Sequence, residues 1–265
     1  MSEADDQLAA RLAGQAGERL LGLRAAKDHG KDAGQNPAED HGKDPAKELR
    51  AAGDRLSHEF LVAELAAARP HDTVLSEEAA DNPARLSAER VWIIDPLDGT
   101  REFGELDRDD WAVHVALWER GELTAGAVAL PAQGKVLSTA EPPPPATPGP
   151  GGATPLRIVV SRTRPPEFVQ RLAEKLGAEL VPMGSAGAKA SAVILGRADA
   201  YVHGGGQYEW DSAAPVAVAR AARLHASRID GSPLRYNQAD LSIPDILICP
   251  ADLAPDLLAA IGGVL

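Results

Sequence analysis

The segment from residue 91 to residue 103 reads Val91-Trp92-Ile93-Ile94-Asp95-Pro96-Leu97-Asp98-Gly99-Thr100-Arg101-Glu102-Phe103. Its four leading apolar residues predict a short buried strand, and the acid, proline and glycine that follow predict a stiff turn. Two carboxylates, Asp95 and Asp98, would then lie at the carboxyl end of that strand. Carboxylates beside a glycine and a hydroxyl suit a hard divalent cation, with a phosphate held by neighbouring backbone N–H groups.

Taken alone, the acidic residues of this segment are equally well explained as ordinary turn chemistry. Two further acidic groups favour a cation site. Ser76-Glu77-Glu78 follows the apolar stretch 73–75, and Glu209-Trp210-Asp211 precedes an apolar, helix-like run. Three acidic clusters at the ends of elements indicate one cation site rather than three separate turns.

Together, the three motifs resemble the signature of the lithium-sensitive, magnesium-dependent phosphomonoesterases. That superfamily includes inositol monophosphatase, fructose-1,6-bisphosphatase and 3′(2′),5′-bisphosphate nucleotidase. The resemblance runs from about Asp54 to Asp245. Residues 99–103 resemble the nucleotidase branch of the CysQ type most, because inositol-type members usually have Asn before the Phe that is Phe103 here.

The resemblance implies an α/β fold: a layered αβαβα sandwich with two sheets between three helical layers. It also implies a homodimer. We expect an N-terminal half, residues 1–140, with most metal ligands, and a C-terminal half, residues 156–265, that completes the site. Residues 141–155, rich in Pro and Gly, suit neither a helix nor a strand and predict an exposed connecting loop.

The resemblance also implies a set of metal ligands, for two or three Mg²⁺ ions per site. Glu77, Asp95 and the Leu97 carbonyl would hold one ion, and Asp95, Asp98 and Asp211 a second. Two cations about 3.5–4 Å apart stabilise both the nucleophile and the leaving oxygen of a phosphoryl transfer. Glu78 would carry a third, weaker cation or brace the site.

Asp54 and Thr100 are expected, by the same resemblance, to orient the water that attacks phosphorus in line. Asp54 lies in a predicted helix, but residues 51–53 read Ala-Ala-Gly where relatives usually carry a Thr and a Lys. The residues implied to bind substrate are Gly99, Thr100, Arg101, Ser185 and Lys189. The last two belong to residues 184–189, which open a helix that forms a wall of the substrate site in the family.

The substrate expected from the resemblance is adenosine 3′,5′-bisphosphate, or its 5′-phosphosulfate relative, cleaved at the 3′-phosphate as part of sulfate assimilation. Arg101 places a cation where a second phosphate could be met bidentately. Residues 203–206, His-Gly-Gly-Gly, stand where inositol-type members tend to place an acid that grips sugar hydroxyls. The alternative is a permissive phosphatase that also takes inositol 1-phosphate and fructose 1,6-bisphosphate.

Two competing interpretations come from other classes of protein. In the haloacid-dehalogenase phosphatases, the motif that carries the nucleophile reads Asp-x-Asp, with one residue between the two aspartates. Here two residues separate Asp95 from Asp98. A non-catalytic metal or nucleotide sensor on the same fold is the second rival. All metal-ligating carboxylates expected of the family are present, so the sequence favours an enzyme.

The composition limits the partners and the location of the protein. A net charge of −12 argues against a nucleic-acid polymer or an anionic membrane as partner, and an aromatic content of 4% argues against a base-stacking platform. The single cysteine, Cys249, lies in an apolar run and is expected in the core. The N-terminus lacks the pattern of a signal peptide, so we expect a cytoplasmic protein.

The remaining elements follow from periodicity and breaker residues. Between predicted helices at 8–26 and 46–68, residues 27–44 repeat the pentad Asp-His-Gly-Lys-Asp and predict a solvated, mobile loop, which beside a phosphatase site could also act as a lid. His29 and His41 in this loop are the alternative, as candidate metal ligands. Strands are expected at 111–117, 123–130, 156–160, 180–183 and 199–202. Helices are expected at 167–176, 184–196 and 211–222, and the glycines 204–206 predict a flexible joint.

Overall fold

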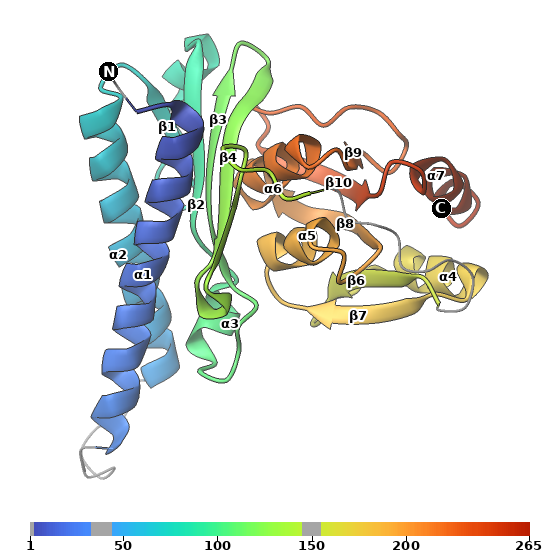
Figure 1. Cartoon of the computed structure of the whole chain (residues 1–265), viewed down its shortest axis with the longest axis horizontal. Coiled ribbons are helices and arrows are strands. Elements are labelled where there is room, and N and C mark those ends of the chain that lie inside the picture. Colours follow the sequence, from blue (N-terminus) through green and yellow to red (C-terminus); the bar gives the residue numbers. More distant parts are fainter. Residues whose placement is uncertain (1–2, 33–43, 145–154) are drawn as a thin grey trace.

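The computed structural model describes residues 3–32, 44–144 and 155–265, and the side chains of residues 28–32 are not described. Two sheets alternate with three layers of helices (Figure 1). The first sheet has the order β1-β2-β3-β4-β5, in which β1 pairs parallel with β2 and the other neighbours are antiparallel. Its strands are β1 (Thr73–Ser76), β2 (Arg90–Asp98), β3 (Ala112–Glu119), β4 (Glu122–Leu130) and β5 (Lys135–Ser138).

The second sheet has the order β7-β6-β8-β10-β9, with β6 parallel to both of its neighbours. Its strands are β6 (Arg157–Ser161), β7 (Glu179–Met183), β8 (Ala200–Tyr208), β9 (His225–Ser227) and β10 (Ser242–Cys249). In the described residues, therefore, each of the two predicted halves of the chain contributes one sheet.

Helices fill the space between the sheets and cover both outer faces (Figure 1). The outer layers are α1 (Asp5–Asp32) with α2 (Pro45–Ala68) on the first sheet and α4 (Glu167–Leu176) with α7 (Ala254–Gly262) on the second. The central layer holds α5 (Ala186–Ile194) and α6 (Glu209–Ala221), and the short α3 (Thr100–Gly104) follows β2. The predicted αβαβα sandwich is confirmed.

The alternation of side chains along β2 explains why its apolar run is unbroken. Val91 and Ile93 pack into the core cluster shared with α5 and α6, whereas Trp92 and Ile94 pack against α1 and α2. Successive strand residues point to opposite faces, and here both faces are covered by helices. The four residues are fully buried, so the strand that carries Asp95 and Asp98 is held from both sides.

Three local expectations differ from the structure. β2 continues through Asp98 with a shift of register after Asp95, and the chain turns at Gly99, whose φ of 84° is readily accessible only to glycine. α1 runs to Asp32, so the first pentad is helical rather than looped, because no proline occurs before Pro37 to stop it. The glycines 204–206 continue β8 instead of forming a joint.

Other expectations match closely. α4 spans Glu167–Leu176 as predicted, and β3 and β4 form a hairpin through Arg120 and Gly121. Cys249 is fully buried in the apolar cluster between the second sheet and the helices α4 and α7. The second pentad up to residue 43, with His41, and residues 145–154 of the predicted connecting loop lie outside the described residues. Among the helices that are described, none combines the length and the apolar character needed to cross a membrane.

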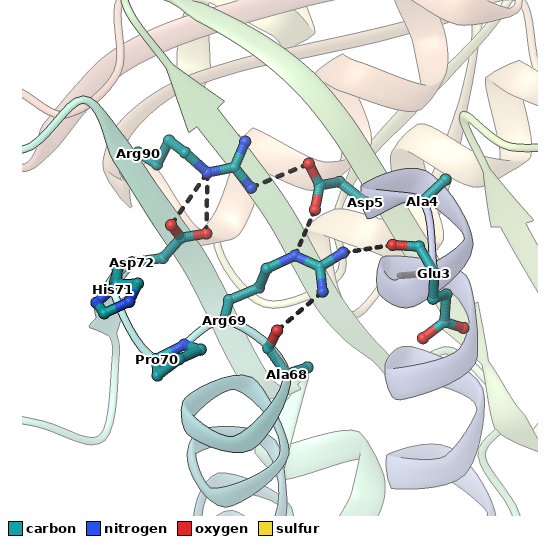
Figure 2. A pocket seen from close by; sticks show the side chains of 9 residues that line it. All are labelled: Glu3, Ala4, Asp5, Ala68, Arg69, Pro70, His71, Asp72 and Arg90. Carbon is teal, nitrogen blue, oxygen red and sulfur yellow. Dashed lines mark hydrogen bonds and ion pairs between the residues drawn. The ribbon is translucent and has the colours of Figure 1, made fainter. Parts of the chain in front are cut away.

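A cluster of charged side chains fixes the start of β2 to the outer helices (Figure 2). Asp5 of α1 accepts hydrogen bonds from Arg69 (2.7 Å) and Arg90 (2.9 Å), and Arg90 also contacts Asp72 at 3.0 Å. These residues line a cavity of about 530 Å³. Arg69 and Arg90 are already paired with carboxylates, and these ion pairs connect the first sheet to the outer helices. The cavity therefore offers no unpaired arginine to an anionic ligand among the residues that line it.

Candidate functional site

Three carboxylates from two different layers meet at the end of β2. Oxygen atoms of Asp95, Asp98 and Asp211 all lie within 4.8 Å of one another. Asp95 and Asp98 are buried at the carboxyl end of β2, and Asp211 is the third residue of α6. The structure therefore brings together the two motifs, 113 residues apart between Asp98 and Asp211, that were expected to share one cation site.

Backbone N–H groups hold these carboxylates in place. Asp95 Oδ1 accepts a hydrogen bond from the Leu97 N–H at 3.1 Å. Asp211 Oδ2 accepts one from the Tyr208 N–H at 2.7 Å, and this second bond is also part of the N-terminal cap of α6. A carboxylate fixed by the main chain needs little rearrangement to bind a ligand.

Asp98 is held by the first turn of α5. Its Oδ1 accepts from the Ala186 N–H at 3.1 Å and its Oδ2 from the Gly187 N–H at 2.6 Å. Burial alone would raise the pKa of Asp98, but the nearby His114 and the Gly187 N–H lower it to about 2. The unpaired N–H groups of a helix N-terminus stabilise negative charge in this way.

The remaining acids repel one another. Burial, with the charges of Glu77 and Asp98, raises the pKa of Asp95 well above its ordinary value. Burial followed by the charge of Asp98 raises the pKa of Asp211 to about 7. The pKa of Glu77 is also raised to about 7, by loss of water and then by its acidic neighbours. Burial is the largest cause of this shift, and the charges of Asp98, Glu78 and Asp54 add to it.

Asp54 and Thr100 lie side by side at the edge of this cluster. Thr100 Oγ1 donates to the Leu97 carbonyl at 3.1 Å and lies 3.5 Å from Asp54 Oδ1. Burial and the charge of Glu78 raise the pKa of Asp54 to about 6, although the Thr100 hydroxyl opposes the shift. The Thr100 hydroxyl has a single hydrogen for two acceptors, the Leu97 carbonyl and Asp54. If the Leu97 carbonyl bound another partner, the Thr100 hydroxyl would be free to donate its hydrogen bond to Asp54.

The loop before α5 is built from backbone contacts. Ser185 caps α5 by accepting from the Ala188 N–H at 2.8 Å, and Lys189 Nζ donates to the carbonyls of Gly184 and Ser185, the latter at 2.9 Å. Lys189 is buried, and burial lowers its pKa while nearby carboxylates such as Asp98 oppose that shift. A buried ammonium thus faces the acidic cluster.

A cavity of about 380 Å³ opens beside the cluster. Its lining includes Asp98, Gly99, Asp211, Ser185 and Lys189, all expected from the sequence. It also includes His203 and the glycines 204–206, which the sequence placed at the substrate site, together with Ser161, Arg164 and Gln207, which were not expected. A volume of this size accommodates a small phosphorylated molecule.

Arg101 does not line this cavity. It is exposed on α3, whereas its neighbour Glu102 is buried and accepts a hydrogen bond from Arg162 Nε at 2.5 Å. The arginine that lines the cavity is Arg164, for whose guanidinium the described residues show no partner. The backbone N–H of Arg164 donates to Ser161 Oγ at 3.3 Å.

Sequence reasoning missed Arg164 and His114. Arg164 follows a strand, at the end where ligands of parallel sheets gather, and that position was a usable signal. His114 lies in an apolar strand with no local signal, because its proximity to Asp98 comes from the pairing of β3 with β2.

Comparisons with known proteins agree with this geometry. The sequence pattern of the inositol monophosphatase family matches residues 2–261. The chain is 51% identical to the 3′-phosphoadenosine 5′-phosphate phosphatase of Mycobacterium leprae, over 98% of this chain and 94% of that one. It is 32% identical to the 3′(2′),5′-bisphosphate nucleotidase CysQ of Escherichia coli, over 70% of this chain and 78% of that one.

Solved structures resemble it in the same way. The CysQ structure from Bacteroides thetaiotaomicron superposes with a TM-score of 0.68 at 27% identity, covering 91% of this chain and 95% of that one. An inositol monophosphatase from Zymomonas mobilis superposes with a TM-score of 0.73 at 20% identity, covering 98% and 100%. The second likeness concerns the fold alone.

Proposed function

Because the chain belongs to the inositol monophosphatase family, we propose that it is a divalent-metal-dependent phosphatase acting on adenosine 3′,5′-bisphosphate. The reaction is hydrolysis of the 3′-phosphate ester to give AMP and inorganic phosphate. The relatives named as phosphatases of this nucleotide support the substrate. The observation that carries the proposal is the carboxylate cluster Asp95–Asp98–Asp211 opening on a cavity that Lys189 and Arg164 also line.

The residues at the cluster fit a hard divalent cation such as Mg²⁺. Asp95, Asp98 and Asp211 would hold it, with Glu77 and the Leu97 carbonyl as further oxygen donors for a second ion. The buried acids have strongly raised pKa values as they stand, so a cation among them would remove the repulsion. A bound divalent cation would supply positive charge for the phosphoryl oxygens and lower the pKa of water at the site.

Asp54 is the group best placed to take a proton from the attacking water. Its pKa of about 6 leaves it ionised at neutral pH yet basic enough to accept a proton. Thr100, 3.5 Å away, would orient that water or the base itself. Lys189 of α5, which lines the cavity, would favour the negative charge of a phosphoryl group, while the Ala186 and Gly187 N–H groups hold Asp98 in place.

The second phosphate of the substrate would meet Arg164. Arg164 shares the cavity with the acids, and a guanidinium binds a phosphate through two parallel N–H donors. The glycines 204–206 leave the cavity wall without side chains, which suits a nucleoside better than a small polyol. Arg101, first proposed for this role from the sequence, is exposed on α3 and would have to reach the substrate from outside the cavity.

The test is a turnover panel in Mg²⁺ with adenosine 3′,5′-bisphosphate, inositol 1-phosphate and fructose 1,6-bisphosphate. We expect kcat/KM to be highest for the nucleotide. A higher value for inositol 1-phosphate would contradict the proposed substrate but keep the phosphatase. Binding of Mg²⁺ and nucleotide without turnover would instead favour a sensor, and a trapped aspartyl-phosphate would favour the haloacid-dehalogenase mechanism.

A further inference from the structure

His114 lies inside the protein against the carboxylate cluster. It is on β3, directly opposite Asp95 of β2 in the register of the first sheet, and it is fully buried. Its ring lies between two layers, because the first turn of α6 packs over β3 at this point. A histidine in this position contacts groups from the sheet and from the central helices at once.

The two ring nitrogens contact different elements. Nδ1 lies 3.0 Å from the backbone carbonyl of Trp210, and since a carbonyl only accepts, Nδ1 carries the hydrogen and donates it. Nε2 lies 3.2 Å from Asp98 Oδ2, within ion-pair distance, although its N–H is not aligned for a hydrogen bond. One ring therefore connects Asp98 to the residue that precedes Asp211.

The ring has little freedom to leave this position. A Cβ placed on Gly187 would lie 2.1 Å from His114 Nε2, so the backbone of α5 approaches the ring as closely as a glycine allows. The same Gly187 donates its N–H to Asp98 Oδ2. The helix, the histidine and the carboxylate are packed against one another without intervening space.

We propose that His114 is a positioning residue that fixes the spacing between the carboxylates of Asp98 and Asp211, and through it the affinity of the site for Mg²⁺. The inference rests on the proposed function, because it assigns a role toward the cation that this cluster would hold. His114 itself touches neither substrate nor cation. It acts by joining the end of β2 to the start of α6, which carry the two carboxylates.

Three substitutions separate this role from simple packing. His114→Asn retains a donor near the position of Nδ1, His114→Gln retains one near Nε2, and His114→Leu retains only apolar volume. If the role of His114 needs both contacts, the one with the Trp210 carbonyl and the one with Asp98, each of the three variants should bind Mg²⁺ on the order of tenfold more weakly. A loss of this size is typical when a residue that contacts a metal ligand is removed. Isothermal calorimetry with Mg²⁺ alone measures this directly, without turnover.

The kinetic readout should show the same pattern. The Mg²⁺ concentration at half-maximal rate should rise with the dissociation constant, while KM for the nucleotide at saturating Mg²⁺ should stay within about twofold of the original, on the scale of uniform binding effects. Wild-type affinity in His114→Gln would show that only the Asp98 contact matters, and wild-type affinity in His114→Leu that only volume matters. Either result overturns the proposal.

Two further variants guard against effects of folding. Gly187→Ala displaces the ring without removing it, and we expect a similar loss of Mg²⁺ affinity; unchanged affinity would overturn the proposal even if the His114 variants do not fold. Val169→Ala, a truncation on α4 in a core cluster that contains none of the three carboxylates, is the matched control. It should lower stability with unchanged Mg²⁺ affinity, and an equal loss of affinity there would contradict the inference.

Titration of the wild-type protein with Mg²⁺ distinguishes a failure of the proposed function from a failure of the role assigned to His114. A wild-type protein that neither binds Mg²⁺ nor hydrolyses the nucleotide refutes the proposed function, and the inference with it. A wild-type protein that binds Mg²⁺, together with folded His114 variants of the same affinity, refutes the inference and leaves the proposed function standing.

Discussion

Replacing Asp211 by Asn should stabilise the metal-free protein at alkaline pH while weakening its activity. In the folded protein Asp211 holds its proton up to about pH 7, whereas the ordinary value for the unfolded chain is 3.8. Folding therefore opposes ionisation above pH 3.8, and the loss of stability grows up to about pH 7 and then stays constant. Asn has the same shape and no charge, and its carbonyl oxygen can still accept from the Tyr208 N–H.

The size of the effect follows from the two pKa values. A rise from 3.8 to about 7 corresponds to about 4 kcal/mol at a pH well above 7, at about 1.4 kcal/mol per pH unit. Asp98 and Glu77 contribute to the same repulsion and relax when Asp211 is neutral, so we expect about half, ~2 kcal/mol. For a chain of this length that is roughly 4–8 °C in Tm.

Thermal unfolding in EDTA at pH 8 and at pH 5 tests this expectation. Asp211→Asn should raise Tm at pH 8 and raise it clearly less at pH 5, where the wild-type carboxyl is already protonated. Asp107→Asn, which removes an exposed charge on another part of the surface, is the matched control and should change little at either pH. A lower Tm at pH 8, or the same gain at both pH values, would refute the reasoning.

Three other expectations concern activity. Asp95→Asn should lower kcat by about 10³-fold even at saturating Mg²⁺, because it removes charge from between two cation positions; near-normal initial rates would rule out a bridging role. Arg164→Ala should raise KM for adenosine 3′,5′-bisphosphate about tenfold, as expected for a lost phosphate pair, and Arg101→Ala should not; equal effects would return the role to Arg101. The rate should fall below about pH 6, where Asp54 becomes protonated. If the residual rate of Asp54→Asn falls in the same pH range, a group other than Asp54 causes the decrease.

Inhibition by lithium is a further expectation that comes from the family resemblance. Li⁺ should inhibit at concentrations where Na⁺ does not, because Li⁺ is close to Mg²⁺ in size but carries half its charge. Parallel titrations of the two chlorides at fixed ionic strength measure the difference. Equal insensitivity would indicate that the second cation position is altered.

Sequence reasoning succeeded where chemistry is local. The acids of residues 95–98 and Asp211 were recognisable because each follows or precedes an apolar run. The helix predicted at 167–176 has the same bounds in the structure, where Pro166 and Gly177 cap it. The layered fold followed from the family motif rather than from periodicity. The acids of the site and the bounds of α4 depend on neighbours within a few positions of the chain, whereas the layered fold was inferred from motifs far apart in the sequence.

The remaining features depend on how strands pair. His114 reaches Asp98 only because β3 lies beside β2 in one register, and a shift of one residue would have turned its ring to the outer helices. Likewise, the turn expected at Asp95 moved to Gly99 because pairing with β3 keeps Asp98 in the sheet. The sequence of a single strand contains neither partner nor register.

The contact between Gly187 and His114 has a consequence for how this protein can change. A side chain at position 187 would collide with the ring, so the substitution of Gly187 is harmful while His114 is present and becomes tolerable once a smaller residue has replaced it. The reverse holds as well: a histidine can enter position 114 only opposite a glycine. Relatives with a side chain at position 187 should therefore have a residue smaller than histidine at position 114, because a lineage can gain that side chain only after losing His114.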